Sequence, residues 1–165
     1  MNELLKGDLK MPEIGHVGYL VQSAEQAAER FKTVCGTEDF YVYEYTPQRA
    51  FACGKEMFDC KLKIALCTPE KGAKIELIEV LSGRETPHFK AFEQSGEQIH
   101  HIAYYVDDMH EYDAWRAYYS GLGATFVFEA DVEDDVMGRR CCFYATLPGM
   151  PHIIEFCKRG AVVKA

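Results

Sequence analysis

Two segments of the chain, Ile14–Val21 and Ile99–Val106, share a pattern of β-branched and aromatic residues. The first reads Ile-Gly-His-Val-Gly-Tyr-Leu-Val, and the second reads Ile-His-His-Ile-Ala-Tyr-Tyr-Val. Such a composition is typical of β-strands. Because the same pattern occurs once in each half of the chain, it indicates an internal duplication.

A helix start signal follows each of these strands. Ser23 with Gln26 forms a capping box in the first copy, and Asp108 with Glu111 forms an acidic variant in the second. Apolar residues then recur at helical spacing in both copies. They are Ala27, Ala28, Phe31 and Val34 in the first helix, and Met109, Tyr112, Trp115, Tyr119 and Leu122 in the second.

The rest of each half predicts three further strands. They cover 39–45, 59–67 and 74–80 in the first half and 125–130, 139–146 and 152–157 in the second. Each half is therefore β-α-β-β-β, and we expect two modules, 1–81 and 99–165, within one compact domain. The connector 82–98 is polar, with a short helix over 87–94, whereas 46–58 is predicted to be a long connection.

Strand parity divides the side chains of the duplicated strands between two faces, because alternate residues point to opposite sides. Val17 and Ile102 take the face that the helix covers, whereas His16 and His101 point away from it. His100 has the parity of the helix face and is therefore the weaker candidate for a functional role.

The last strand of each half carries a second matched residue. Lys-Ile-Glu-Leu-Ile around Glu76 corresponds to Ile-Ile-Glu-Phe-Cys around Glu155, and both carboxylates point away from the helices. Glu79 falls on the opposite parity. A carboxylate among apolar strand residues is costly to bury unless it is paired or bound to a cation.

Each half thus places one His and one Glu on the face away from its helix. Two imidazoles and two carboxylates suit Zn²⁺, Ni²⁺, Co²⁺, Fe²⁺ or Mn²⁺, whereas Ca²⁺ and Mg²⁺ prefer oxygen ligands alone. Each residue by itself is more often structural. The repetition in the same order and parity favours a divalent metal site at His16, Glu76, His101 and Glu155.

Composition restricts the class of protein. The 165 residues are 48% apolar and 27% charged, which is typical of a globular chain. The net charge of −8 argues against a nucleic-acid partner. No apolar run reaches the roughly 18 residues of a membrane helix, and the first residues have no signal-peptide core. We therefore expect a cytoplasmic protein without a membrane partner.

The remaining titratable residues predict less chemistry. The seven cysteines are odd in number and contain no Cys-x-x-Cys pair, so we expect reduced thiols rather than disulfides or a cysteine zinc site. The acidic run Glu129–Asp135 is predicted to be a solvated loop. Arg139 and Arg140 are expected to pair with this run rather than to hold a substrate anion.

The paired segments resemble the vicinal-oxygen-chelate superfamily, which includes glyoxalase I, methylmalonyl-CoA epimerase and extradiol dioxygenases. The resemblance covers about residues 14–157. It implies an α+β fold in which two βαβββ modules curl mixed sheets into a cup around a divalent metal. By resemblance His16, Glu76, His101 and Glu155 are its ligands, with open positions for substrate oxygens. A homodimer is also expected, with the cup built within one chain or across two.

Within the superfamily, residues 85–103 look most like methylmalonyl-CoA epimerase, and the four-ligand pattern also fits glyoxalase I. Extradiol dioxygenases use only three ligands, two His and one Glu, so the presence of Glu76 as a fourth candidate disfavours membership of that group. The epimerases carry a catalytic Glu on the third strand of the first module, where this chain has Lys61 and Lys63. Either lysine is a candidate base if it faces the cup.

These patterns predict a metal-dependent isomerase or lyase acting on a small oxygenated acid, ketone or thioester through a metal-stabilised enediolate. Glu155 or Glu76 would be the catalytic base. One alternative is an Fe²⁺ dioxygenase that cleaves an aromatic diol or oxidises a keto acid, with Tyr105 lining its pocket. The other is a small-molecule-binding protein without catalysis.

Overall fold

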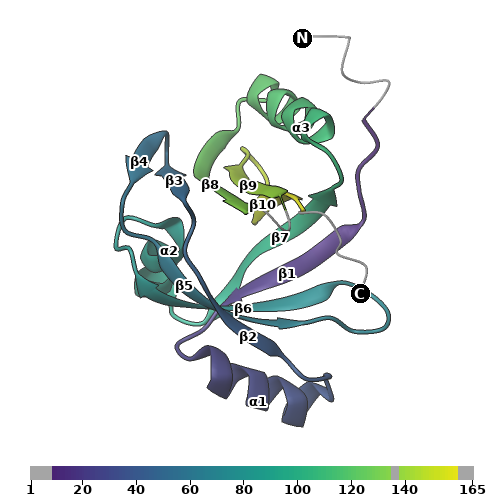
Figure 1. Cartoon of the computed structure of the whole chain (residues 1–165), viewed down its shortest axis with the longest axis vertical. Helices are drawn as coiled ribbons and strands as arrows, with labels where there is room; N and C mark the ends of the chain where they lie inside the picture. Colours follow the sequence, from purple (N-terminus) through teal and green to yellow (C-terminus); the bar gives the residue numbers. More distant parts are fainter. Residues whose placement is uncertain (1–8, 135–137, 160–165) are drawn as a thin grey trace.

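The computed structural model describes residues 9–134 and 138–159, which form one continuous, curled sheet with two long helices on its outside (Figure 1). The strands are β1 (Ile14–Leu20), β2 (Tyr41–Tyr45), β3 (Arg49–Ala52), β4 (Lys55–Met57), β5 (Lys61–Cys67), β6 (Lys74–Ser82), β7 (Gln98–Val106), β8 (Thr125–Asp134), β9 (Gly138–Thr146) and β10 (Ile153–Lys158). The helices are α1 (Ala24–Cys35), α2 (Pro87–Ser95) and α3 (Met109–Gly121).

The ten strands run in the order β2-β5-β6-β1-β7-β10-β9-β8-β3-β4. The two copies of the duplicated strand, β1 and β7, are antiparallel neighbours and join the halves at the middle of the sheet. Each also pairs in parallel with the last strand of its own half, β1 with β6 and β7 with β10. The expected α+β fold of curled mixed sheets is therefore confirmed, and one chain builds the cup.

Both long helices begin where the sequence predicts. Ser23 caps α1 by accepting the backbone N–H of Gln26, and Asp108 caps α3 by accepting that of Glu111. Helix α1 ends at Gly36, whose φ of 66° is in the left-handed region that glycine tolerates. The short connector helix α2 is present as well.

Two helices cover the outer face of the sheet, and the inner face lines the cup. Helix α1 packs through Ala24, Ala27 and Ala28 against the sheet around Leu77. Helix α3 packs through an aromatic cluster that includes Trp115 and Phe156, whose rings stack with centroids 4.8 Å apart. The inner face has its own apolar cluster: Leu20, Leu62, Ile64, Ile78 and Phe128. The parity assignment of the two faces is thus confirmed for these strands.

The structure corrects two loop predictions. Segment 46–58 contains the hairpin β3–β4, which extends the sheet beside β8. Its two-residue turn uses Cys53 and Gly54, both with positive φ (48° and 76°), which is the backbone that tight hairpins need. The acidic run is also strand rather than loop as far as Asp134, while Asp135 lies outside the described residues. Asp131 in this strand pairs with Arg139.

Two further expectations concern the chain as a whole. All seven cysteines are free thiols, as predicted from their number and spacing. Within residues 9–134 and 138–159, none of the helices has the length and apolar character needed to cross a membrane.

Candidate metal centre

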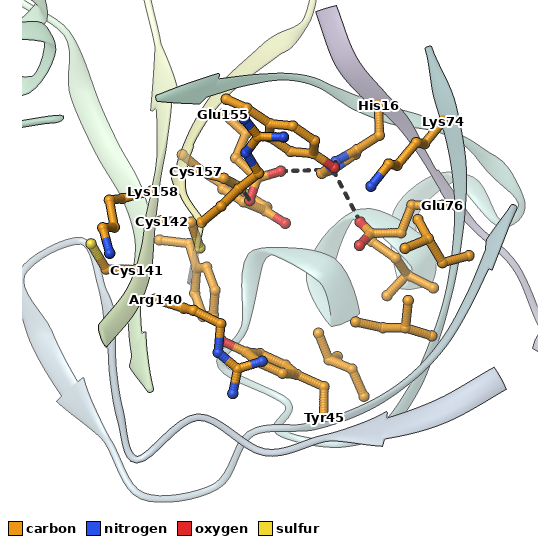
Figure 2. Close-up of a pocket in the computed structure, with 18 of the residues that line it drawn as sticks. His16, Tyr45, Lys74, Glu76, Arg140, Cys141, Cys142, Glu155, Cys157 and Lys158 are labelled. Atoms are coloured by element: carbon orange, nitrogen blue, oxygen red, sulfur yellow. Dashed lines mark hydrogen bonds and ion pairs between the residues drawn. The ribbon is translucent and has the colours of Figure 1, made fainter. Parts of the chain in front are cut away.

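The four predicted ligands come together in the middle of the cup. His16 lies on β1, Glu76 on β6, His101 on β7 and Glu155 on β10, and these are four adjacent strands of the sheet. One donor atom from each residue lies within 4.8 Å of the other three. Figure 2 shows His16, Glu76 and Glu155 converging on one space.

The distances between donor atoms match those of a shared cation. His16 Nε2 lies 3.0 Å from His101 Nε2, and Glu155 Oε2 lies 3.0 Å and 2.9 Å from these two nitrogens. Glu76 Oε2 is slightly farther from them, at 3.3 Å and 3.5 Å. Ligands about 2.0 to 2.2 Å from one metal ion lie about 3.0 to 3.5 Å apart. The residues present therefore fit a divalent ion.

A buried oxygen supports the same reading. Glu155 Oε2 makes no hydrogen bond of acceptable geometry among the described residues, although two imidazole nitrogens lie close to it. Its other oxygen, Oε1, accepts a hydrogen bond from the Cys157 thiol at 2.8 Å. Buried polar atoms are normally satisfied, and a cation between the donors would satisfy this one.

Each imidazole has a partner on the ring nitrogen that faces away from the centre. His16 Nδ1 lies 2.8 Å from the Tyr105 hydroxyl, and His101 Nδ1 lies 3.0 Å from His100 Nδ1. A proton on Nδ1, donated to these partners, leaves the Nε2 lone pair free to bind a metal. The surroundings thus favour the tautomer that metal binding requires.

His100 does not lie where its parity predicts. Gly18 pairs with His101 and Tyr19 with Ile99, so His100 is an extra residue in β7 and forms a β-bulge. A bulge interrupts the alternation of faces. His100 therefore turns to the cup side, where it is 5% exposed and its ring lies 4.9 Å from that of His88.

Two glycines of β1 make room for side chains of β7. A Cβ on Gly18 would lie 2.1 Å from His101 Cε1, and a Cβ on Gly15 would lie 2.7 Å from the Tyr105 ring. His101 and Tyr105 therefore cross β1 at positions that only glycine allows. The pattern Ile-Gly-His-Val-Gly is explained by this crossing.

The four groups hold one another in charged forms when no cation is bound. Burial alone would lower the pKa of His16, but Glu76 and Glu155 outweigh it and raise this pKa to about 10. The pKa of His101 is raised for the same reason. Burial opposes ionisation of Glu76, yet the two imidazoles lower its pKa to about 2. The pKa of Glu155 likewise lies well below its ordinary value.

A cavity of about 590 Å³ opens beside these four residues, which is within the range of small-molecule sites. Its wall combines three kinds of side chain. Those that line it besides His16, Glu76 and Glu155 include Leu62, Ile64, Leu66, Ile78 and Phe128, then Tyr43, Tyr45, Tyr105 and Tyr144, and finally Lys74, Arg140, Lys158 and Arg159. The aromatic contribution expected from Tyr105 is present.

A comparison with family models matches residues 15–143 to the Glyoxalase/Bleomycin resistance protein/Dioxygenase superfamily. The chain belongs to this superfamily. Its members typically bind a divalent metal, and the His/Glu cluster of this chain has the donors to hold one. None of the curated proteins compared with the chain matches it.

Solved structures share the superfamily fold. Methylmalonyl-CoA epimerase from Mycobacterium tuberculosis has a TM-score of 0.62 at 19% identity, covering 92% of this chain and 93% of that one. A hypothetical protein from Bacillus halodurans has a TM-score of 0.64 at 22% identity, covering 93% and 98%. A mutant of 4-hydroxymandelate synthase from Streptomyces coelicolor has a TM-score of 0.62 at 14% identity, covering 99% of this chain and 54% of that one. At such identities the likeness shows the fold alone.

The structure corrects the idea that a lysine of β5 acts as the base in this superfamily member. Lys61 pairs with Glu44 at 2.6 Å and Lys63 with Glu25 at 2.9 Å, both on the outer face. The alternate residues of β5, such as Leu62, line the cavity instead.

Sequence reasoning missed most of the cationic residues at the cavity. Lys74 lies two positions before Glu76 on β6 and shares its face, so parity was sufficient to find it. Lys158 and Arg159 lie at the end of β10, where alternation stops being informative. Arg139 pairs with Asp131 as expected, and Arg140 lines the cavity.

Proposed function

We propose that this protein is a divalent-metal-dependent isomerase or lyase that moves a proton on the carbon next to a carbonyl group. Its substrate would be a small oxygenated acid, ketone or thioester. The observation that carries the proposal is the convergence of His16, Glu76, His101 and Glu155 at the wall of an open cavity. Membership of a superfamily with epimerase structures supports it.

The donor set indicates how the chain would use a metal ion. His16 and His101 would hold the ion through Nε2, and the partners on Nδ1 would keep both rings in place. When bound, the ion would act as a Lewis acid that polarises the substrate oxygens and acidifies the neighbouring C–H bond. The side of the cluster that faces the cavity would remain open for these oxygens.

The two carboxylates differ in how firmly they are held. Glu155 Oε2 lies within 3.0 Å of both imidazoles, and its side chain is 5% exposed. Glu76 Oε2 lies 3.3 Å and 3.5 Å from them, and its side chain is 12% exposed. Glu76 is therefore the carboxylate that turns more easily toward a substrate proton, with Glu155 as the alternative base. A placed base contributes about 10² to 10⁴ in rate.

Two measurements test the proposed function. Elemental analysis of protein purified without added metal should find Zn, Ni, Co, Mn or Fe at about one ion per chain. The protein is then incubated in heavy water with coenzyme A thioesters and glutathione hemithioacetals. Proton NMR should detect exchange at the carbon next to the carbonyl. Absence of a bound divalent ion contradicts the proposal, and iron with oxygen consumption favours a dioxygenase.

Substitution of the carboxylates gives the matched test. Glu76→Gln should lower the exchange rate by about 10² or more while metal is still retained, because an amide ligates but cannot take up the proton. Glu155→Gln should weaken metal retention as well, because this carboxylate is closer to both imidazoles. Glu70→Gln changes an exposed residue outside the cavity and should leave the exchange rate unchanged. Full activity of both Glu76→Gln and Glu155→Gln would contradict the assignment of either carboxylate as the catalytic base.

A further inference from the structure

The cavity is cationic, although the chain as a whole carries a net charge of −8. Four basic side chains line it: Lys74, Arg140, Lys158 and Arg159. Among the described lining residues, the carboxylates are Glu76 and Glu155, and both belong to the metal cluster. A divalent ion would neutralise these two carboxylates, and the remaining charge of the cavity wall would then be positive.

Lys74 is the basic residue placed best to meet a ligand. It begins β6 two residues before Glu76 and therefore shares its face. Figure 2 shows its ammonium group directed into the cavity beside His16 and Glu76. The ammonium lies 5.5 Å from the centre of the Tyr105 ring. This ring is the same one whose hydroxyl contacts His16 Nδ1.

The partners of Lys74 differ from those of the outer lysines. Lys61, Lys63 and Lys90 each pair with a glutamate, whereas Lys74 forms no ion pair with a carboxylate among the residues that the structure describes. A half-buried ammonium that faces a cavity without a carboxylate attracts an anion to that place.

Arg159 adds a second cation over the same ring. Its guanidinium carbon lies 5.0 Å from the centre of the Tyr105 ring, and one of its nitrogens pairs at 2.8 Å with Asp107, which is 84% exposed. Lys158 donates to the Arg139 carbonyl oxygen at 2.8 Å, which leaves its charge uncompensated by that contact. Lys74 and Arg159 are thus the two basic side chains that lie over the Tyr105 ring, close to His16.

Another part of the cavity wall is apolar. Leu62, Ile64, Ile78 and Phe128 belong to the buried cluster inside the cup and also line the cavity. A ligand that fits both the basic and the apolar parts of the wall has an apolar body and an anionic end.

We propose that Lys74, with Arg159 beside it on the Tyr105 ring, binds an anionic group of the substrate. The substrate is then an organic acid whose apolar body lies against Leu62 and Phe128 and whose carbonyl oxygens face the metal cluster. This inference rests on the proposed function, since that function assigns the reacting oxygens to the cluster. The inference restricts the substrate classes of the proposed function, which were acids, ketones and thioesters, to those that carry a negative charge.

The test uses three hydroxamates, which chelate metals through two oxygens. They are butyrohydroxamate, which is uncharged at its far end, succinic acid monohydroxamate, which ends in a carboxylate, and the phosphonate analogue of similar length. Each is titrated calorimetrically into zinc-loaded protein at low ionic strength. We expect at least one anionic probe to bind about five- to tenfold more tightly than the uncharged one. The stronger of the two anions identifies the group that the site prefers.

Matched variants attribute that preference to Lys74. Lys74→Met should bring the affinity ratio of anionic to uncharged probe close to one, with binding of the uncharged probe unchanged. Arg159→Gln should lower the ratio in part. Lys71→Met removes an exposed lysine three positions earlier on the chain and should leave the ratio as it is. Equal affinities in the unmodified protein, or a ratio that Lys74→Met does not lower, would overturn the inference.

Failure of the proposed function gives a different result. If the protein binds neither zinc nor cobalt, the proposed function fails, and the anion site is tested in metal-free protein with phenylacetate and phenylacetamide. Heteronuclear NMR should then show tighter binding of the acid, and Lys74→Met should abolish the difference. Equal binding of the two probes overturns the anion site. Metal binding without an anion preference overturns the anion site alone.

Discussion

At the scale of single residues, the centre depends on how four titratable side chains are packed. Gly18 leaves the space in which the His101 ring lies, and the Tyr105 hydroxyl holds the His16 ring from behind. Burial on its own would discharge all four groups, but their mutual contacts keep the imidazoles and carboxylates in their charged forms. The two carboxylates thus lie where a bound cation would replace the protons of the imidazoles as their positive partner.

The substitution Gly18→Ala tests the space beside His101. The added Cβ would lie 2.1 Å from His101 Cε1 and would push the ring out of place. We expect the affinity for Co²⁺ to fall at least about tenfold and stability to fall by about 1 to 3 kcal/mol. Cobalt absorption titration and thermal unfolding measure these effects. Gly121→Ala, at a helix end with no atom near the new Cβ, should change neither property by a comparable amount.

Metal binding should be linked to pH through the same residues. Because the pKa of His16 is raised to about 10, this imidazole is protonated near neutral pH in metal-free protein, and the neighbouring carboxylates raise the pKa of His101 as well. The raised pKa of His16 stabilises the metal-free fold below its unfolded pKa of 6.5, and this contribution is lost as the pH rises toward 10.

Metal must displace these protons, so its affinity should increase with pH over that interval. Calorimetric titration with zinc in buffers of different ionisation heats should show at least about one proton released per ion at neutral pH. Binding without proton release would show that the imidazoles are neutral in the metal-free protein.

At the scale of elements, one β-bulge decides what lies behind His101. The extra residue in β7 turns His100 into the cup, where its Nδ1 meets His101 Nδ1. The pKa of His100 is lowered to about 2 by burial, so the ring is neutral and is able to accept a hydrogen bond. The helix caps and the strands of the two modules, apart from β3, β4 and the end of β8, follow local patterns and were predictable.

His100→Leu tests the contribution of this bulge. Loss of the acceptor for His101 Nδ1–H should weaken binding of Co²⁺ about 10- to 100-fold, because partners of ligating imidazoles contribute to that extent. His100→Gln keeps an acceptor and should restore part of the affinity. His110→Gln, on the exposed face of α3, is the control. An unchanged cobalt affinity in His100→Leu would show that His101 is oriented by packing alone.

At the scale of the whole molecule, the four clustered His and Glu residues link the two halves of the chain. Each half supplies one histidine and one glutamate, and the β1–β7 pairing brings the two sets together. The described residues of one chain therefore complete the donor set, while the homodimer expected from the resemblance stays a prediction that light scattering would test.

Removal of the metal should consequently destabilise the whole fold. A ligand present at about 100 times its dissociation constant adds about 2.7 kcal/mol to the stability of the folded state. We expect a chelator to lower the unfolding temperature of zinc-loaded protein by several degrees. The same chelator should have no effect on His16→Ala, which lacks a ligand. An equal decrease in unfolding temperature in the unmodified protein and in His16→Ala would show that zinc binds at another site.

Local periodicity was sufficient to predict the duplication, the two faces of the duplicated strands, the starts of the two long helices and the four candidate ligands. The side on which His100 lies could not be predicted in this way, because the bulge arises in the pairing of β7 with β1. The place of β3 beside β8 and the outward turn of Lys61 likewise depend on long-range pairing. The basic wall around Lys74 forms because the curled sheet brings β6 and the end of β10 to one cavity, and no local pattern records that curvature.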